Sequence, residues 1–170
     1  MKEYNSLNNN KKYKILFVCL GNICRSPAAQ GIMESLIAER GLQNMIEVDS
    51  AGTYGGHTGS LPDTRMRVHA RRRGYELTHR SRQATWQDYR AFDKIVVMEK
   101  SNWHALQPLF GCVGEDKIVE IGPYIRMNRH YDYVPDPYYD GDEGFELVLD
   151  LLEDACAALL DEICRQIKEA

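Results

Sequence analysis

An apolar run that stops abruptly at a glycine is the feature that most constrains this fold. Residues 13–20 (YKILFVCL) are apolar nearly throughout and rich in β-formers, which predicts a strand of a parallel sheet buried on both faces. The run ends at Gly21-Asn22, a pair suited to positive φ. Ser26 predicts a helix N-cap and Pro27 the first helical position. We therefore expect a buried strand, a tight loop and a helix in immediate succession.

Strand-like and helix-like segments alternate along the rest of the chain. Short apolar segments predict three further strands, at 45–50, 92–98 and 117–121. Caps and helical spacing predict helices at 26–41, 63–73, 101–109, with Ser101 at its cap, and 143–168. Alternation of this kind implies βαβ units around a parallel sheet. We therefore expect a single α/β domain over residues 13–170, preceded by a flexible tail over residues 1–12.

Composition excludes several classes of protein. The chain has 170 residues, a net charge of −4 and a pI near 5.7, which argues against a general nucleic-acid binder because such proteins are usually basic. No segment approaches the roughly 18 apolar residues of a membrane span. The five cysteines are odd in number and lack zinc-like pairing. We therefore expect a cytoplasmic protein with free thiols and no membrane or nucleic-acid partner.

The loop after the first strand places Cys19 and Arg25 in a Cys-x5-Arg spacing. A helix N-terminus with free backbone N–H groups favours an anion, and the same field favours the ionised thiolate of Cys19. Arg25 carries a planar fork that matches two phosphoryl oxygens. Ser26 lies within reach of the sulfur. The alternative is that Cys19 is only a buried strand residue and Arg25 a surface charge. We call residues 19–26 the phosphate loop.

The other residues of the phosphate loop are candidates for binding the anion. Backbone N–H groups of Leu20, Gly21, Asn22, Ile23 and Cys24 are expected to face the bound group, as in a nest. Asn22 suits a left-handed bend and a bracing amide. Cys24 has two interpretations, a reversible disulfide with the first loop cysteine or an inert core residue. No Gly-Lys-Ser/Thr follows, which excludes a Walker-type loop.

A candidate general acid lies far along the chain, in the segment 134–139 (VPDPYY). Asp136 stands between two prolines that restrict the backbone and so aim a short carboxylate. Tyr138 and Tyr139 could form an apolar wall against an aromatic ring. An acidic, solvated turn is an equal interpretation of this segment alone. We call residues 134–139 the acid segment.

The remaining charged patterns indicate no metal site. The five histidines show neither H-x-H nor H-E-x-x-H spacing, and residues 140–144 lack the ligands and the glycine of a calcium loop. No metal and no cofactor are therefore expected. Five arginines lie on the predicted helix 63–73, at positions 65, 67, 71, 72 and 73. They form either a solvated face or a docking face for acidic phosphoproteins.

Taken together, these motifs resemble the low-molecular-weight protein tyrosine phosphatase family over about residues 14–168. The resemblance rests on VCLGNICRSP at 18–27, DSAG at 49–52, PD at 62–63, HRSRQ at 79–83 and DP at 136–137, which match in the expected order. It implies a three-layer α/β sandwich, with a four-stranded parallel sheet flanked by helices and the phosphate loop after the first strand.

The resemblance also implies roles for individual residues. Cys19 would be the nucleophile, Arg25 the phosphate binder, Ser26 the thiolate partner and Asp136 the general acid and base. His79, together with the loop asparagine, would brace the phosphate loop. The implied reaction is hydrolysis of phosphotyrosine monoesters through a cysteinyl-phosphate intermediate. The implied partners are phosphotyrosine proteins, with a tyrosine kinase and its substrates among the candidates. Independently of the resemblance, we expect a monomer, or a weak dimer if the tyrosine pair self-associates.

Some features separate this chain from the family pattern and from related activities. The family commonly has an aromatic residue where this chain has Gly56, so either Tyr54 or His57 takes its place or the cleft is more open. A protein arginine phosphatase of the same fold would have Thr at Ile23 and lack the tyrosine pair. A thiol-dependent arsenate reductase would need two further redox cysteines on a mobile segment, and residues 79–98 contain none. A catalytically dead phosphotyrosine-binding module would not need the nucleophile, arginine and acid together.

Overall fold

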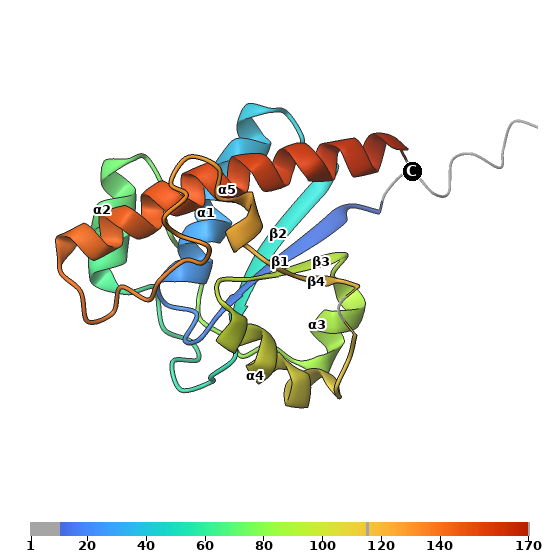
Figure 1. The fold of residues 1–170 in the computed structure, drawn as a ribbon, viewed down its shortest axis with the longest axis horizontal. Helices are drawn as coiled ribbons and strands as arrows, with labels where there is room; N and C mark the ends of the chain where they lie inside the picture. The colour runs from blue at the N-terminus through green and yellow to red at the C-terminus, as the bar shows by residue number, and fades with distance from the viewer. Residues whose placement is uncertain (1–10, 115, 170) are drawn as a thin grey trace, which may run out of the picture.

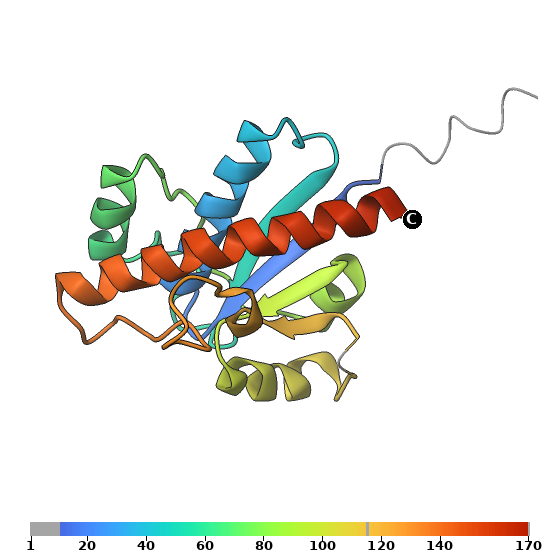
Figure 2. The ribbon, with the colours of Figure 1, turned by 45° about the horizontal axis from the view of Figure 1, so that its top comes forward.

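A computed structural model describes residues 11–114 and 116–169. Four parallel strands form one sheet in the order β2-β1-β3-β4. The strands are β1 (Tyr13–Cys19), β2 (Ile46–Gly52), β3 (Lys94–Val97) and β4 (Ile118–Glu120). The helices are α1 (Arg25–Glu39), α2 (Thr64–Arg72), α3 (Trp86–Ala91), α4 (Lys100–Phe110) and α5 (Asp142–Glu169), with a 3-10 turn η1 (Gly122–Tyr124). Figures 1 and 2 show α1 and α5 on one face of the sheet and α3 and α4 on the other. The expected three-layer α/β fold is confirmed.

Strand β1 belongs to two hydrophobic cores at once. Successive side chains of a strand point to opposite faces, so Ile15 and Phe17 enter the core beneath α1 and α5, whereas Leu16 and Val18 enter the core beneath α3 and α4. All four side chains are fully buried. Burying a side chain of this size stabilises a fold by roughly 1.5–3 kcal/mol. The continuous apolar run therefore forms a strand that is anchored on both faces of the sheet.

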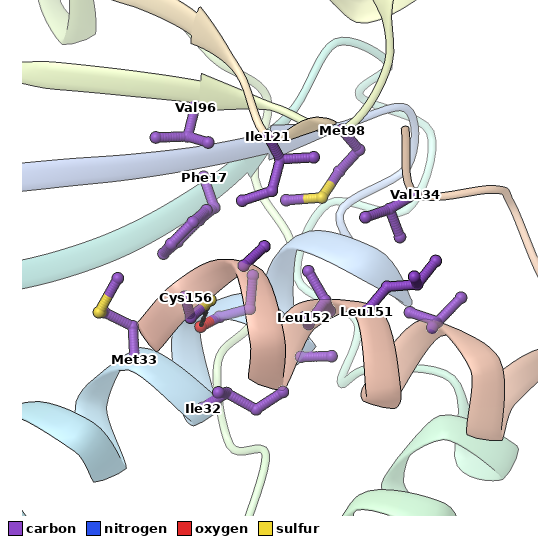
Figure 3. Packing of buried hydrophobic residues seen from close by; sticks show 14 of the residues in the cluster. Phe17, Ile32, Met33, Val96, Met98, Ile121, Val134, Leu151, Leu152 and Cys156 are labelled. Carbon is purple, nitrogen blue, oxygen red and sulfur yellow. Dashed lines mark hydrogen bonds between the residues drawn. The ribbon is translucent and has the colours of Figure 1, made fainter. Parts of the chain in front are cut away.

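Helix α5 closes the larger core. Figure 3 shows Leu152 and Cys156 of this helix on its side toward Phe17 of the sheet, and Leu151 toward Val134. The helix begins at Asp142, with two residues between it and the acid segment, so the acid segment leads into a helix that is packed against the core. No helix among the described residues is both long and apolar enough to cross a membrane.

The structure corrects two predicted helix starts and adds a helix. Ser26 is not an N-cap, because α1 begins at Arg25 and the serine side chain turns toward the phosphate loop instead. Helix α4 begins at Lys100, with Glu99 at the cap position expected for Ser101. Helix α3 was not predicted; it has only six residues and one buried side chain. The tail expected over residues 1–12 lies almost wholly outside the described residues and stays a prediction.

Candidate active site

The phosphate loop lies where the carboxyl ends of β1 and β3 meet. The connection from β1 leads to one side of the sheet, to β2, and the chain then crosses to β3 on the other side. Open parallel sheets place their ligand sites at such a change of direction. Cys19 is the last residue of β1, and Glu99 follows β3 by two residues. The topology therefore brings together groups that are 80 positions apart in the sequence.

The backbone of the phosphate loop turns its carbonyl groups outward. The carbonyl oxygens of Cys19, Leu20 and Ile23 accept hydrogen bonds from the N–H groups of Thr53, Tyr54 and Asp63, at 3.0, 2.9 and 2.7 Å. The carbonyl of residue 21 accepts from the hydroxyl of residue 81 at 3.0 Å. The N–H groups of residues 21–26, in contrast, donate to no other described residue. N–H groups without an acceptor in a tight loop at a helix N-terminus are available to bind an anion, as in an anion nest.

A chain of buried polar groups leads to the sulfur of Cys19. Ser26 Oγ lies 3.0 Å from Cys19 Sγ and accepts a hydrogen bond from Asn22 Nδ2 at 2.7 Å. The same amide nitrogen donates to Ser50 Oγ at 3.0 Å, and that hydroxyl donates to Gln30 Oε1 at 2.6 Å. The sulfur is closer to this hydroxyl than the carbonyl oxygen of residue 51 is, at 3.4 Å. When the sulfur is ionised it can only accept, so the serine is then the donor.

Asn22 is fully buried and uses its whole amide group. Its backbone has φ of 56°, a left-handed conformation that asparagine tolerates better than most residues. Its Oδ1 accepts from His79 Nε2 at 3.0 Å and from the backbone N–H of Arg82 at 3.1 Å. Burial lowers the pKa of His79 from its ordinary value, while Asp49 opposes this shift and Arg82 adds to it. A neutral imidazole that donates from Nε2 fits this contact.

Arg25 is held from one side and presents its other side to the cleft. Its side chain is 3 % exposed. Nη1 donates to Glu99 Oε2 at 2.7 Å and to the carbonyl oxygen of Val134 at 3.1 Å. Nη2 lies 3.6 Å from Asp136 Oδ2. The guanidinium is therefore oriented by fixed acceptors, and a bound oxyanion would compete with Asp136 for Nη2.

The site opens into a cleft of about 250 Å³. The lining comprises Cys19, Leu20, Gly21, Ile23, Cys24, Arg25, Tyr54, His57, Asp136, Tyr138 and Tyr139. Tyr54 and Tyr138 are partly exposed, whereas Tyr139 is 94 % exposed. The rings of Tyr138 and Tyr139 meet edge to face with centroids 4.9 Å apart. A cleft lined by the phosphate loop and by tyrosine rings suits a phosphate group attached to a flat ring.

The aromatic wall beside the phosphate loop comes from Tyr54. A Cβ atom on Gly56 would stand 2.2 Å from atoms of the Tyr54 ring, so the ring occupies space that any other residue at position 56 would need. The Tyr54 ring also meets His57 edge to face, with centroids 5.9 Å apart. Both residues that the sequence offered in place of an aromatic residue at 56 therefore line the cleft.

Cys24 also lines the cleft but differs from Cys19 in its surroundings. Burial raises the pKa of the Cys24 thiol well above its ordinary value, and the carboxylate of Asp63 adds to this effect. Cys24 therefore stays protonated at neutral pH and is a weak nucleophile. Both cysteines are free thiols in the structure.

The structure gathers the sequence-derived candidates into two groups. Nine line the cleft, as given above, and three lie behind it, namely Asn22, Ser26 and His79. Sequence reasoning missed Glu99 and Ser50, which orient the arginine and the asparagine. Each stands at or near the carboxyl end of a strand, and this position next to the phosphate loop is the signal that could have identified them.

Comparisons with known proteins agree with this geometry. A family model described as low molecular weight phosphotyrosine protein phosphatase matches residues 14–169. A low molecular weight protein-tyrosine-phosphatase of Bacillus subtilis is 39% identical over 153 residues, which cover 89% of this chain and 96% of that protein. A crystal structure of a protein tyrosine phosphatase from Entamoeba histolytica has a TM-score of 0.86 at 39% identity, covering 91% of this chain and 99% of that one. A Drosophila arginine phosphatase has a TM-score of 0.80 at 32% identity, covering 88% and 97%.

Proposed function

Since the chain belongs to the low molecular weight phosphotyrosine protein phosphatase family, we propose that Cys19, Arg25 and Asp136 carry out its hydrolysis of phosphotyrosine esters. The protein is a cysteine-based protein tyrosine phosphatase. The observation that carries the assignment of residues is the position of Cys19 Sγ, 3.0 Å from a serine hydroxyl in a loop whose N–H groups at residues 21–26 donate to no other described residue. Arg25 and Asp136 stand 3.6 Å apart at the same cleft.

The first chemical step transfers the phosphoryl group to sulfur. The thiolate of Cys19 attacks phosphorus, while the loop N–H groups and Arg25 bind the phosphoryl oxygens and stabilise their charge. The bond from phosphorus to the phenolic oxygen breaks, and Asp136 gives its proton to that oxygen. Ser26 donates a hydrogen bond to the sulfur, which matters most when the sulfur later leaves.

The second step returns the enzyme to its starting state. A water molecule attacks the phosphorus of the cysteinyl phosphate and gives a proton to the Asp136 carboxylate. The bond between sulfur and phosphorus breaks, and inorganic phosphate and the Cys19 thiolate result. Because the reaction begins with an ionised thiol and a protonated carboxyl group, we expect activity to be greatest below neutral pH.

The walls of the cleft favour an aromatic ester. Tyr54 and Tyr138 present ring surfaces above the phosphate loop, and such surfaces bind a phenyl ring better than a serine side chain. We expect the physiological partners to be phosphotyrosine proteins, with a tyrosine kinase and its substrates as the candidates. We also propose a cytoplasmic location, since the five cysteines are free thiols, and a monomer or weak dimer.

Protein arginine phosphatase is the second candidate activity. It is favoured by the similarity to the Drosophila arginine phosphatase. The residue at position 23 is an isoleucine that lines the cleft, where the resemblance implies threonine for arginine phosphatases. Thiol-dependent arsenate reduction would need further redox cysteines beside the cleft, and among the described residues only Cys19 and Cys24 line it.

Purified protein would be assayed on a phosphotyrosine peptide, a phosphoarginine peptide and arsenate with a thiol reductant. We expect hydrolysis of phosphotyrosine at a kcat/KM at least tenfold above that for phosphoarginine, and no arsenate reduction. Cys19→Ser should abolish turnover, whereas Cys112→Ser, which alters an exposed cysteine away from the cleft, should not. Turnover of phosphotyrosine by Cys19→Ser would overturn the mechanism, and a preference for phosphoarginine would overturn the substrate assignment.

A further inference from the structure

Arg65 lies beside the cleft without lining it. It stands in the first turn of α2, and its side chain is 46 % exposed. The guanidinium carbon lies 5.4 Å from the ring centroid of Tyr138, in the acid segment, and 4.7 Å from that of Phe145, in the first turn of α5. A guanidinium near two aromatic rings at such distances attracts both. Arg65 thus contacts one ring on each side of the junction between the acid segment and α5.

Arg65 is also connected to the phosphate loop, through Asp63. Arg65 Nε and Nη2 donate to the two carboxylate oxygens of Asp63, at 3.1 and 3.0 Å. The same carboxylate caps α2 by accepting the backbone N–H of Arg65 at 2.9 Å. The backbone N–H of Asp63 donates to the carbonyl oxygen of Ile23 at 2.7 Å. The guanidinium is therefore held in one orientation, relative to the loop that carries the nucleophile.

Tyr138 in turn holds the acid. Its backbone N–H donates to Asp136 Oδ1 at 3.0 Å, and the other oxygen of that carboxylate faces Arg25. A shift of the Tyr138 ring that carries its backbone along would therefore disturb this hydrogen bond to the carboxylate. An exposed Arg–Asp pair contributes little to stability by itself, so the position of Arg65 matters for what it aligns.

We propose that Arg65 is a positioning residue that sets the distance between Asp136 and the phosphate loop. This inference rests on the proposed function, because it assumes that Asp136 protonates the leaving group. Arg65 acts through Tyr138 and touches neither the phosphate nor the leaving group. Its loss should therefore impair proton donation more than binding of the phosphate.

The test compares Arg65→Gln with the wild type on two esters. Phenyl phosphate has a poor leaving group and needs the acid, whereas p-nitrophenyl phosphate has a good one and needs it less. We expect kcat/KM for phenyl phosphate to fall roughly tenfold and that for p-nitrophenyl phosphate less than about threefold. Arg71→Gln, on the exposed side of the same helix and paired with Glu76, should change neither value.

A double-mutant cycle then asks whether Arg65 acts through the ring of Tyr138. Arg65→Gln should cause no further loss on phenyl phosphate when added to Tyr138→Leu, and independent, multiplying losses would overturn the proposal. Equal losses on both esters in Arg65→Gln would also overturn it, because they would indicate a structural role alone. If the wild type hydrolyses neither ester, the proposed function itself fails and this inference with it.

Discussion

Arg25 Nη1 lies 2.7 Å from Glu99 Oε2, and this ion pair joins the start of α1 to the residue before α4. The same nitrogen donates to the carbonyl oxygen of Val134 in the acid segment. Arg25 is therefore fixed by the phosphate loop, by the end of β3 and by the acid segment together. The pair explains how an almost fully buried guanidinium keeps one face turned toward the cleft.

Replacing Glu99 should loosen Arg25. Glu99→Ala leaves the buried guanidinium without its charged acceptor, which should lower the free energy of unfolding by about 1–3 kcal/mol and raise KM for aryl phosphates. Urea unfolding and steady-state kinetics measure the two effects. Glu76→Ala, which breaks the exposed pair with Arg71, is the control and should change stability by less than about 1 kcal/mol. Identical behaviour of the two variants would contradict the role of Glu99.

Asp136→Asn removes the proton donor but keeps the size of the side chain. We expect kcat/KM for phenyl phosphate to fall by roughly 10²–10⁴. The fall should be much smaller for p-nitrophenyl phosphate, because nitrophenolate leaves without protonation. A plot of log kcat/KM against the pKa of the leaving phenol should therefore become steeper. Parallel plots for the wild type and the variant would show that Asp136 is not the acid.

Two substitutions at Asn22 separate its backbone from its amide. Asn22→Gly keeps a residue that accepts φ of 56° but removes the hydrogen bonds to Ser26, Ser50 and His79. Asn22→Ala removes the same bonds and adds left-handed strain of about 1 kcal/mol. We expect both variants to unfold at lower urea concentration than the wild type, with the alanine variant lowest. A glycine variant as stable as the wild type would mean that the buried amide contributes nothing.

Stability should fall on acidification through His79. Burial lowers the pKa of His79 in the folded protein. Below about pH 6.5 the His79 imidazole therefore binds a proton in the unfolded chain but stays neutral in the folded protein. The free energy of unfolding should therefore decrease as pH falls from about 6.5 to the pKa of His79 in the folded state. Below that pKa the contribution of His79 should become constant. Urea titrations across that range should show a shallower decrease in His79→Gln. The exposed His130→Asn is the control, and equal slopes in all three proteins would contradict the prediction.

Gly56→Ala should move the Tyr54 ring without unfolding the protein. The added Cβ would stand 2.2 Å from the ring, and the end of a flexible side chain yields more easily than backbone does. We expect KM for phenyl phosphate to change roughly threefold, while inhibition by inorganic phosphate stays unchanged because the phosphate loop is intact. At Gly114 a Cβ would meet nothing closer than 3.8 Å, so Gly114→Ala should change neither. An altered inhibition constant for phosphate would place the effect of Gly56 in the loop instead.

The sequence predicted those parts of the molecule that local patterns determine. The run at 13–20 identified β1 because a strand buried on both faces needs apolar residues at every position. Ser26 was misplaced as a cap because the same residue type suits a cap and a buried hydroxyl, and only the folded loop decides between them. Helix α3 was missed although Thr85 and Asp88 form its capping box, because six residues leave too short a pattern.

Spatial pairings account for what the sequence could not provide. Glu99 reaches Arg25 only after β1 and β3 are aligned, and no spacing along the chain encodes that meeting. For the cleft wall, the sequence offered Tyr54 and His57, and only the fold shows that both line the cleft and that the Tyr54 ring fills the space beside Gly56. Such contacts follow from the fold as a whole, whereas the Cys-x5-Arg spacing follows from one loop.

The alternating burial of β1 has a consequence for how this protein could diversify. Cys19 is the last residue of β1, a strand whose side chains pack into both hydrophobic cores. A destabilising substitution in either core would therefore shift the reactive sulfur. The tyrosines that line the cleft, in contrast, lie on surface segments that contribute little to either core. Evolution could therefore change which phosphoproteins this enzyme accepts by substituting these tyrosines, while the chemical reaction stays the same.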